Sequence, residues 1–141
     1  MKKVISIFGA FILVGIIVIS VLKPDELIVF KTSLNDSRLY VEDIVLVSNG
    51  SEIYMPTQIT FKNLTTKNIT DVKFYIKKGD TFIIDAFIQM DGMDMYYFDT
   101  DYHLKNLGFR KRDQLVIELE YLIDGVEKKL TQTLNVSDYM D

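Results

Sequence analysis

Hydrophobic residues follow two different patterns along the chain. Residues 4–22 form a run of 19 residues without a charged side chain, and 14 of them are Ile, Val, Leu or Phe. Beyond residue 25, apolar and polar residues alternate over short segments instead. A long apolar run is typical of a membrane-spanning helix, whereas two-residue alternation is typical of strands buried on one face. The pattern therefore predicts a membrane segment followed by an all-β domain.

The apolar run has the length that a bilayer requires. A helix of 19 residues rises about 28 Å, close to the roughly 30 Å of a hydrocarbon core. Lys2 and Lys3 precede the run and favour a cytoplasmic N-terminus, while Pro24 ends the predicted helix. We therefore predict a signal anchor over residues 1–23, which holds a single-pass protein in the cell membrane through residues 4–22 with its C-terminal domain extracytoplasmic. The alternative is a secretory signal cleaved near Ser20, which would release a secreted domain.

Alternation in the remaining chain predicts an Ig-like antiparallel β-sandwich of about seven to nine strands. Val72, Phe74 and Ile76 are expected to face the core, and so is every second residue from Leu115 to Ile123. We divide this part into a linker with the first strand, residues 24–37, and the sandwich domain, residues 38–141. The predicted strands are 27–32, 39–47, 59–62, 72–77, 81–90, 94–99 and 115–123, with a return strand ending near residue 136.

Asp124-Gly125 is the sharpest local signal for a turn. Both residue types accept a positive φ, which a two-residue type I′ hairpin turn needs at both central positions. Such a turn fixes the register, so Ile123 should lie opposite Val126 and Glu120 opposite Lys129. The result is a hairpin over residues 114–136.

Two segments resemble bacterial Ig-like or fibronectin-like extracytoplasmic modules. From Ile59 to Ile76, a strand ends in Asn-x-Thr, a short polar loop follows, and an alternating strand begins. This arrangement resembles the B–C strand pair of those modules. Residues 107–134 resemble their final two strands, so the resemblance covers about residues 38 to 136. It implies a sandwich used for adhesion or assembly.

Composition excludes several kinds of chemistry. The chain has no Cys and one His, so it has no thiol nucleophile, no disulfide and no zinc site built on Cys or several His. Its formal net charge of −4 gives no general attraction for nucleic acid. His103 has no recognisable catalytic partners, and we expect it to be a hydrogen-bonded loop residue. These features predict a protein that is not an enzyme and needs no cofactor.

Carboxylates are concentrated between residues 91 and 101. Hard cations such as Ca²⁺ bind six to eight oxygen ligands, and a carboxylate cluster supplies such oxygens. The EF-hand pattern is absent, so solvated loop ends are the simpler interpretation. The hypothesis is a calcium site; its candidate ligands are Asp91, Asp94, Asp99 and Asp101.

Two further groups of residues are candidate binding surfaces. Tyr96 and Tyr102 lie among aromatic residues that could stack on a carbohydrate or a protein partner. Arg110-Lys111-Arg112 is a cationic run that could bind lipid headgroups or an anionic wall polymer, although such runs are commonly solvated turns. Five Asn-x-Ser/Thr sequences are interpreted as turn chemistry, because these side chains bond to nearby backbone groups.

The sequence therefore predicts a membrane-anchored, extracytoplasmic and non-catalytic module that docks another envelope protein. A strand edge or an aromatic loop is the expected docking surface. The alternative function is an exported domain that binds Ca²⁺ or a carbohydrate.

Overall fold

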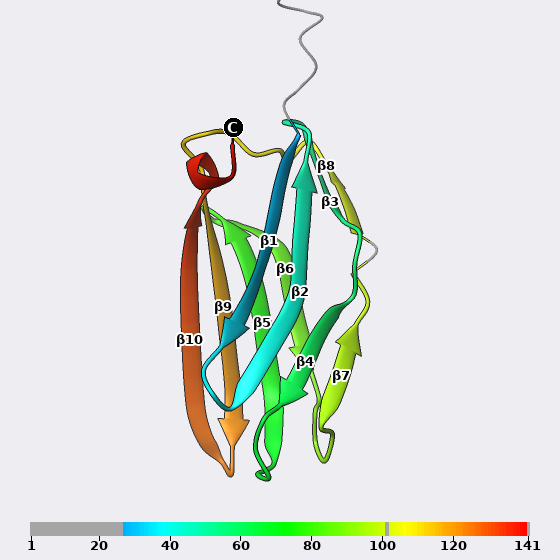
Figure 1. Cartoon of the computed structure of the whole chain (residues 1–141), viewed down its shortest axis with the longest axis vertical. Coiled ribbons are helices and arrows are strands. Elements are labelled where there is room, and N and C mark those ends of the chain that lie inside the picture. Colours follow the sequence, from blue (N-terminus) through cyan, green and yellow to red (C-terminus); the bar gives the residue numbers. More distant parts are fainter. Residues whose placement is uncertain (1–26, 101, 141) are drawn as a thin grey trace, which may run out of the picture.

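The computed structural model of the chain describes residues 27–100 and 102–140, which form two antiparallel sheets packed face to face (Figure 1). No helix in these two ranges is long and apolar enough to span a bilayer. The predicted anchor and residues 24–26 of the predicted linker lie outside the described residues. The elements are β1 (Ile28–Asn35), β2 (Leu39–Ser48), β3 (Glu52–Met55), β4 (Ile59–Asn63), β5 (Ile69–Lys78), β6 (Thr81–Ile88), β7 (Met95–Phe98), β8 (Tyr102–Lys105), β9 (Gln114–Ile123), β10 (Val126–Asn135) and the 3₁₀-helix η1 (Val136–Tyr139).

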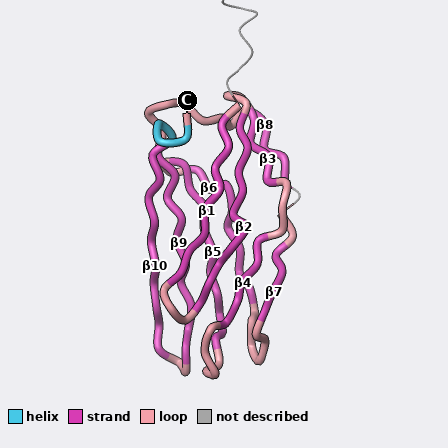
Figure 2. Tube along the Cα trace, in the orientation of Figure 1, coloured by secondary structure: helices cyan, strands magenta, loops and turns pink. Residues whose placement is uncertain are grey.

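In the first sheet, two short strands pair one after the other with the same side of β2. β1 pairs with one side of β2. On the other side of β2, β4 pairs with the first half of β2, and β3 pairs with the last residues of β2. β7 and β8 extend the sheet in the same way, because β7 pairs with β4 and β8 with β3. The second sheet has the order β10-β9-β5-β6. Figure 2 shows the resulting two layers, with the turns gathered at both ends of the sandwich.

The core lies between the two sheets and is built from the inward-facing residues of each. Phe61 on β4 meets Phe74 on β5 edge to face, with ring centroids 5.4 Å apart, and both side chains are fully buried. Phe30 on β1 makes a similar contact with Phe109 in the β8–β9 loop, at 4.9 Å. Edge-to-face contacts stabilise the fold beyond the gain from burying the rings. The aromatic residues therefore join the two sheets to each other and a loop to the first sheet.

The all-β character and the two antiparallel sheets predicted from the sequence are confirmed. Val72, Phe74 and Ile76 are buried, as is every second residue of β9 from Leu115 to Ile123. Asp124 and Gly125 have φ angles of 49° and 76°. The hairpin has the predicted register, with Ile123 opposite Val126 and Glu120 opposite Lys129. Local turn chemistry and alternation were sufficient to place this hairpin.

The described residues form ten strands instead of the predicted seven to nine, because some elements are not predicted by the sequence. β3, β8 and η1 fall in segments without clear alternation. β1, which the sequence analysis grouped with the linker, pairs with β2 along its length and contributes Ile28, Phe30 and Leu34 to the core. The first strand is therefore an integral part of the sandwich.

Candidate functional site

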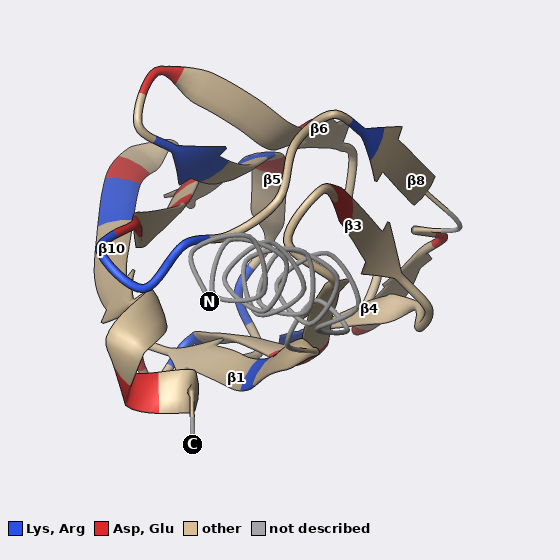
Figure 3. Ribbon diagram, turned by 90° about the horizontal axis from the view of Figure 1, so that it is seen from above, with Lys and Arg blue, Asp and Glu red and all other residues tan. Residues whose placement is uncertain are grey.

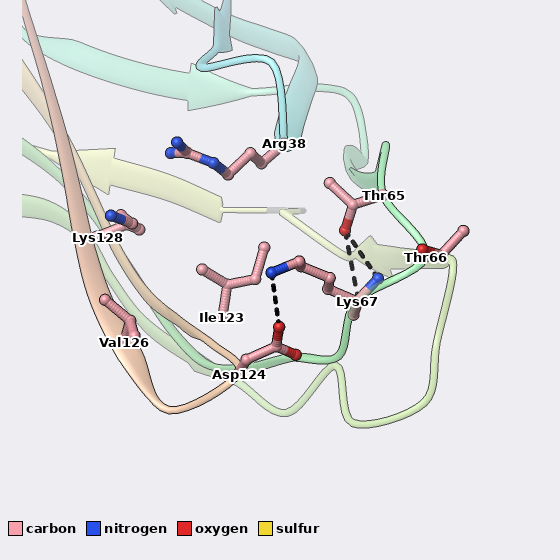
Figure 4. A pocket seen from close by; sticks show the side chains of 8 residues that line it. All are labelled: Arg38, Thr65, Thr66, Lys67, Ile123, Asp124, Val126 and Lys128. Atoms are coloured by element: carbon pink, nitrogen blue, oxygen red, sulfur yellow. Dashed lines mark hydrogen bonds and ion pairs between the residues drawn. The ribbon is translucent and has the colours of Figure 1, made fainter.

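Three turns converge at the end of the sandwich opposite the start of β1 (Figure 1). They are the β1–β2 turn, the β4–β5 loop and the β9–β10 turn, and an open hollow of about 520 Å³ lies between them (Figure 4). This volume is within the range of about 300–1,000 Å³ that is usual for ligand pockets. We call this feature the distal hollow. Its lining residues are Arg38, Thr65, Thr66, Lys67, Ile123, Asp124, Val126 and Lys128.

The distal hollow has a surplus of positive charge. Asp124 is the single carboxylate of the lining and forms an ion pair with Lys67 at 2.9 Å. The Arg38 guanidinium lies 3.8 Å from the Asp36 carboxylate. Within residues 27–100 and 102–140, no carboxylate lies within ion-pair distance of the Lys128 ammonium group. Beside these cations Val126 is 55% exposed. The hollow can therefore accept an anionic group next to an apolar one.

Hydrogen bonds fix the loops that surround the hollow. The Asn63 side chain accepts a bond from the Thr65 N–H at 2.9 Å and donates one to the Lys67 carbonyl at 2.8 Å, which closes the β4–β5 loop. The Asp124 N–H donates to the Asn68 carbonyl at 3.2 Å and joins this loop to the β9–β10 turn. Backbone groups satisfied in this way hold a loop in one conformation. The side chains that line the distal hollow therefore extend from turns held by hydrogen bonds.

A buried tyrosine of the second sheet forms a hydrogen bond with the β1–β2 turn, next to Arg38. Tyr121 on β9 is 1% exposed, and its hydroxyl donates a hydrogen bond to the Asp36 carboxylate. Burial alone would raise the pKa of Asp36, but hydrogen bonds from the Leu39 N–H, the Tyr121 hydroxyl and the Arg38 N–H hold this pKa below its ordinary value. Burial, together with the bond to Asp36, raises the pKa of Tyr121 to about 12. The pair therefore stays as carboxylate and neutral phenol across the physiological range.

Replacing Tyr121 with phenylalanine is expected to lower the free energy of unfolding by about 1.5–3 kcal/mol at neutral pH, the range for a hydrogen bond to a charged group. The folded-state pKa of Asp36 lies below its unfolded value, so the stability from this carboxylate is present above the unfolded pKa and is lost as the pH falls through the folded one. The difference between wild type and variant should therefore shrink in acid. Urea unfolding at neutral and acidic pH measures it.

Tyr75→Phe is the matched control for this experiment. Tyr75 is half-buried on β5, and its hydroxyl has no hydrogen-bond partner in the described part of the chain. This control should unfold at nearly the wild-type urea concentration. A Tyr121→Phe variant that is equally stable at neutral pH would contradict the role given to the bond.

The aspartates predicted to bind calcium are spread along the β6–β7 loop and the strand that follows it. Asp91 accepts a hydrogen bond from the Asn68 side chain at 2.6 Å, Asp94 is exposed just before β7, and Asp99 is exposed just after it. Asp101 lies outside the described residues. Among the residues that are described, no three Asp, Glu or His side chains are close enough together to hold a metal ion. The calcium site stays a prediction from sequence spacing.

The aromatic and cationic candidates occupy different parts of the molecule. Tyr96 lies opposite Phe61 and is half-buried against the core, whereas Tyr97 is 59% exposed on the outer face. Tyr102, at the edge, is 49% exposed. Arg110, Lys111 and Arg112 are exposed in the β8–β9 loop, at the end of the sandwich opposite the distal hollow. The structure thus does not bring the tyrosines and the cationic run into one surface.

His103 lies on strand β8 rather than in a loop. Its Nε2 is 3.0 Å from the Glu52 carboxylate, and its ring stacks on Tyr54 with centroids 4.2 Å apart. The Tyr54 hydroxyl donates to Glu52 at 2.5 Å. Hydrogen bonds from Tyr54 and His103 lower the pKa of Glu52, and the bond to Glu52 raises the pKa of Tyr54. This cluster lies on the exposed face of the first sheet and joins β3 to β8.

Four of the five asparagines of the Asn-x-Ser/Thr sequences take part in local hydrogen bonds at turns or strand ends, and Asn68 instead bonds to the β6–β7 loop. Asn35 accepts from the Ser37 N–H at 2.8 Å, and Asn49 accepts from the Glu52 N–H at 3.0 Å. Asn68 accepts from the Gly92 N–H at 3.0 Å. Asn63 accepts a local bond from the Thr65 N–H at 2.9 Å, and the Asn135 side chain donates one to the Asp138 carboxylate at 3.3 Å. The interpretation as turn chemistry agrees with the structure for Asn35, Asn49, Asn63 and Asn135, whereas the Asn68 side chain joins two separate loops.

Sequence reasoning missed the distal hollow. Arg38, Lys67 and Lys128 are isolated cations in separate turns, and no single segment shows that they meet. The turn signals are visible in the sequence, but the three turns meet only through the pairing of strands within the two sheets. Comparison with protein families, with curated proteins and with solved structures finds no match for this chain. The class defined by its geometry is an all-β sandwich with an open hollow at one end.

Proposed function

We propose that this chain is a membrane-anchored, extracytoplasmic and non-catalytic Ig-like module that docks another envelope protein through the distal hollow. The apolar residues 4–22 support the anchor. The passage of the chain between sheets after β4, β6 and β8 supports an Ig-like connectivity. The observation that carries the docking role is the position of the hollow at the end opposite the start of β1. A chain held in the membrane ahead of β1 presents this end to other proteins.

The lining of the hollow defines the chemistry of the partner. Arg38 and Lys128 favour a carboxylate, and Val126 with Ile123 favours an apolar side chain beside it. Exposed ion pairs contribute little by themselves, so the apolar contact has to supply much of the affinity. The partner is therefore an envelope protein that presents an acidic residue next to an apolar one. Holding both proteins at one membrane raises their effective concentration, which lets a modest affinity suffice.

Site-specific crosslinking in intact cells tests this proposal. A photoreactive amino acid placed at Thr66, an exposed residue of the lining, should yield a discrete crosslinked product. The product should be lost in the double variant Arg38→Ser/Lys128→Ser, because the charge that attracts the partner carboxylate is removed. The matched control is Lys31→Ser/Lys73→Ser, which removes two exposed lysines from outside the hollow and should leave the product unchanged.

Two outcomes would count against the docking role, and a third against the topology. Recovery of the chain alone means that nothing occupies the hollow. Equal crosslinking in both double variants means that the cations of the hollow do not select the partner. For the topology, protease added to spheroplasts should digest the domain, and complete protection would contradict its export.

A further inference from the structure

A second cationic feature lies at the opposite end of the sandwich. Arg110, Lys111 and Arg112 occupy the β8–β9 loop, which crosses the end of the sandwich where β1 starts (Figure 1). Seen from above, the blue part of this loop lies beside β10 (Figure 3). All three side chains are exposed. We call residues 110–112 the basal cations.

Direct contacts connect this loop to the start of β1. Ile28, the first residue of β1, lies opposite Ser48 in the β-ladder. The fully buried Ser48 hydroxyl accepts a hydrogen bond from the Phe109 N–H at 3.1 Å, and the Phe109 ring contacts Phe30. The basal cations therefore follow directly after a residue that is bonded to the strand neighbour of Ile28.

The loop is held in place by groups other than the basal cations. Lys78 binds the Asp113 carboxylate at 2.8 Å and also donates to the Gly108 carbonyl. The Arg110 N–H donates to Asp113 at 2.7 Å, and the Val136 N–H donates to the Asp113 carbonyl at 3.0 Å. The Asp113 carboxylate is thus already bound to the Lys78 ammonium group and to the Arg110 N–H. Within the described chain, none of the three basal cations forms an ion pair.

The distance to the membrane is short in the proposed topology. Six residue steps separate Leu22, the last apolar residue of the predicted anchor, from Ile28. At roughly 3.3–3.6 Å per residue these steps span at most about 22 Å. This reach lets the β8–β9 loop approach an anionic membrane surface to within a Debye length of about 8–10 Å, where basic residues are attracted to it. Closer approach of the loop to the membrane therefore makes this attraction stronger.

We propose that Arg110, Lys111 and Arg112 bind the phosphate groups of anionic phospholipids and dock the base of the sandwich on the membrane. This inference rests on the anchor of the proposed function, and it adds a lipid-binding surface and a fixed orientation of the domain. With the base docked, the distal hollow points away from the bilayer. On a neutral bilayer, the domain is held by its linker alone.

Fluorescence quenching in nanodiscs tests the proposal with the full chain. Since the chain contains no Cys, a single labelled Ser137→Cys reports on the basal end and a labelled Thr66→Cys on the distal end. Discs are made from phosphatidylcholine alone or from an equal mixture with phosphatidylglycerol, each with a nitroxide-headgroup lipid as quencher. Quenching at residue 137 should rise at least about twofold in the anionic discs and fall again at high salt. Residue 66 should show no such rise.

Charge variants assign this effect to the loop. Arg110→Ser/Lys111→Ser/Arg112→Ser should abolish the lipid-dependent rise, whereas Lys31→Ser/Lys73→Ser/Lys129→Ser, which has the same net charge and removes exposed lysines outside both the β8–β9 loop and the distal hollow, should retain it. Equal melting temperatures of the two variants confirm that both are folded. Equal quenching in neutral and anionic discs, with the chain inserted, overturns the lipid surface and leaves the anchor intact. Extraction of the chain from discs by alkaline carbonate overturns the anchor itself, and the inference with it.

Discussion

Replacing Gly108 with alanine is expected to destabilise the domain by more than the ~1–3 kcal/mol that an added methylene costs in a packed core. A Cβ at this position would overlap the carbonyl group of Gly50 and lie against the Ser51 nitrogen. These are backbone atoms of the β2–β3 turn, so no flexible side chain can move aside. To make room, the β8–β9 loop must separate from the turn, which breaks the bond from Phe109 to Ser48. Thermal unfolding followed by far-ultraviolet circular dichroism measures the loss.

Gly79→Ala is the matched control for this substitution. Gly79 has a φ of +56°, and nothing lies within 4 Å of its added Cβ. Its cost is therefore limited to the left-handed backbone conformation, roughly 1–2 kcal/mol. Equal destabilisation by the two variants would contradict the close backbone contact between the loops. Hydrogen exchange of the β8–β9 loop should rise in Gly108→Ala alone.

Phe74→Ala is expected to lower the free energy of unfolding by about 3–5 kcal/mol, the usual cost of removing a buried phenylalanine. Phe74 is fully buried, and its ring meets Phe61 of the opposite sheet at 5.4 Å. The truncation leaves a cavity between the sheets and removes the edge-to-face contact. Two sheets joined around one core cannot close this cavity without shifting relative to each other. Urea unfolding at neutral pH measures the effect.

Phe87→Ala provides the surface comparison. Phe87 on β6 is 59% exposed, so its loss should change the free energy of unfolding by at most about 0.5 kcal/mol. A Phe74→Ala variant that unfolds at the same urea concentration as Phe87→Ala would mean that the sheets are not joined through this contact.

The parts of the fold predicted correctly are those that local chemistry decides. The β9–β10 hairpin follows from one turn dipeptide and from the alternation on either side of it. β3 and β8 are short segments without clear alternation, and β3 is followed directly by Pro56, so neither is recognisable as a strand from its own residues. β3 is a strand because it pairs with β2, and β8 is a strand because it pairs with β3. Pairing between distant segments cannot be seen in the pattern of a single short segment.

The candidate site was harder to predict than the fold, for a related reason. Tyr96 and Tyr97 are adjacent, and which of them is exposed depends on the pairing of β7 with β4, where Phe61 faces the core. The distal hollow depends on three turns that are far apart in the sequence. Arg110-Lys111-Arg112 was visible as a motif, but its place beside the start of β1 needed the contact between Phe109 and Ser48. Residue chemistry was readable from the sequence, whereas its arrangement in space was not.

The pairing of β1 with β2 determines how the domain responds to mechanical force. Backbone hydrogen bonds between antiparallel strands lie across the strand direction. A pull on the chain ahead of Ile28, opposed at the distal hollow, is directed along β1 and loads its bonds with β2 from Ser48 to Tyr40 simultaneously. The strand must therefore slide as a unit instead of detaching one bond at a time. A sandwich of this design, pulled from the chain ahead of Ile28, resists extension along its long axis more strongly than peeling from its edge.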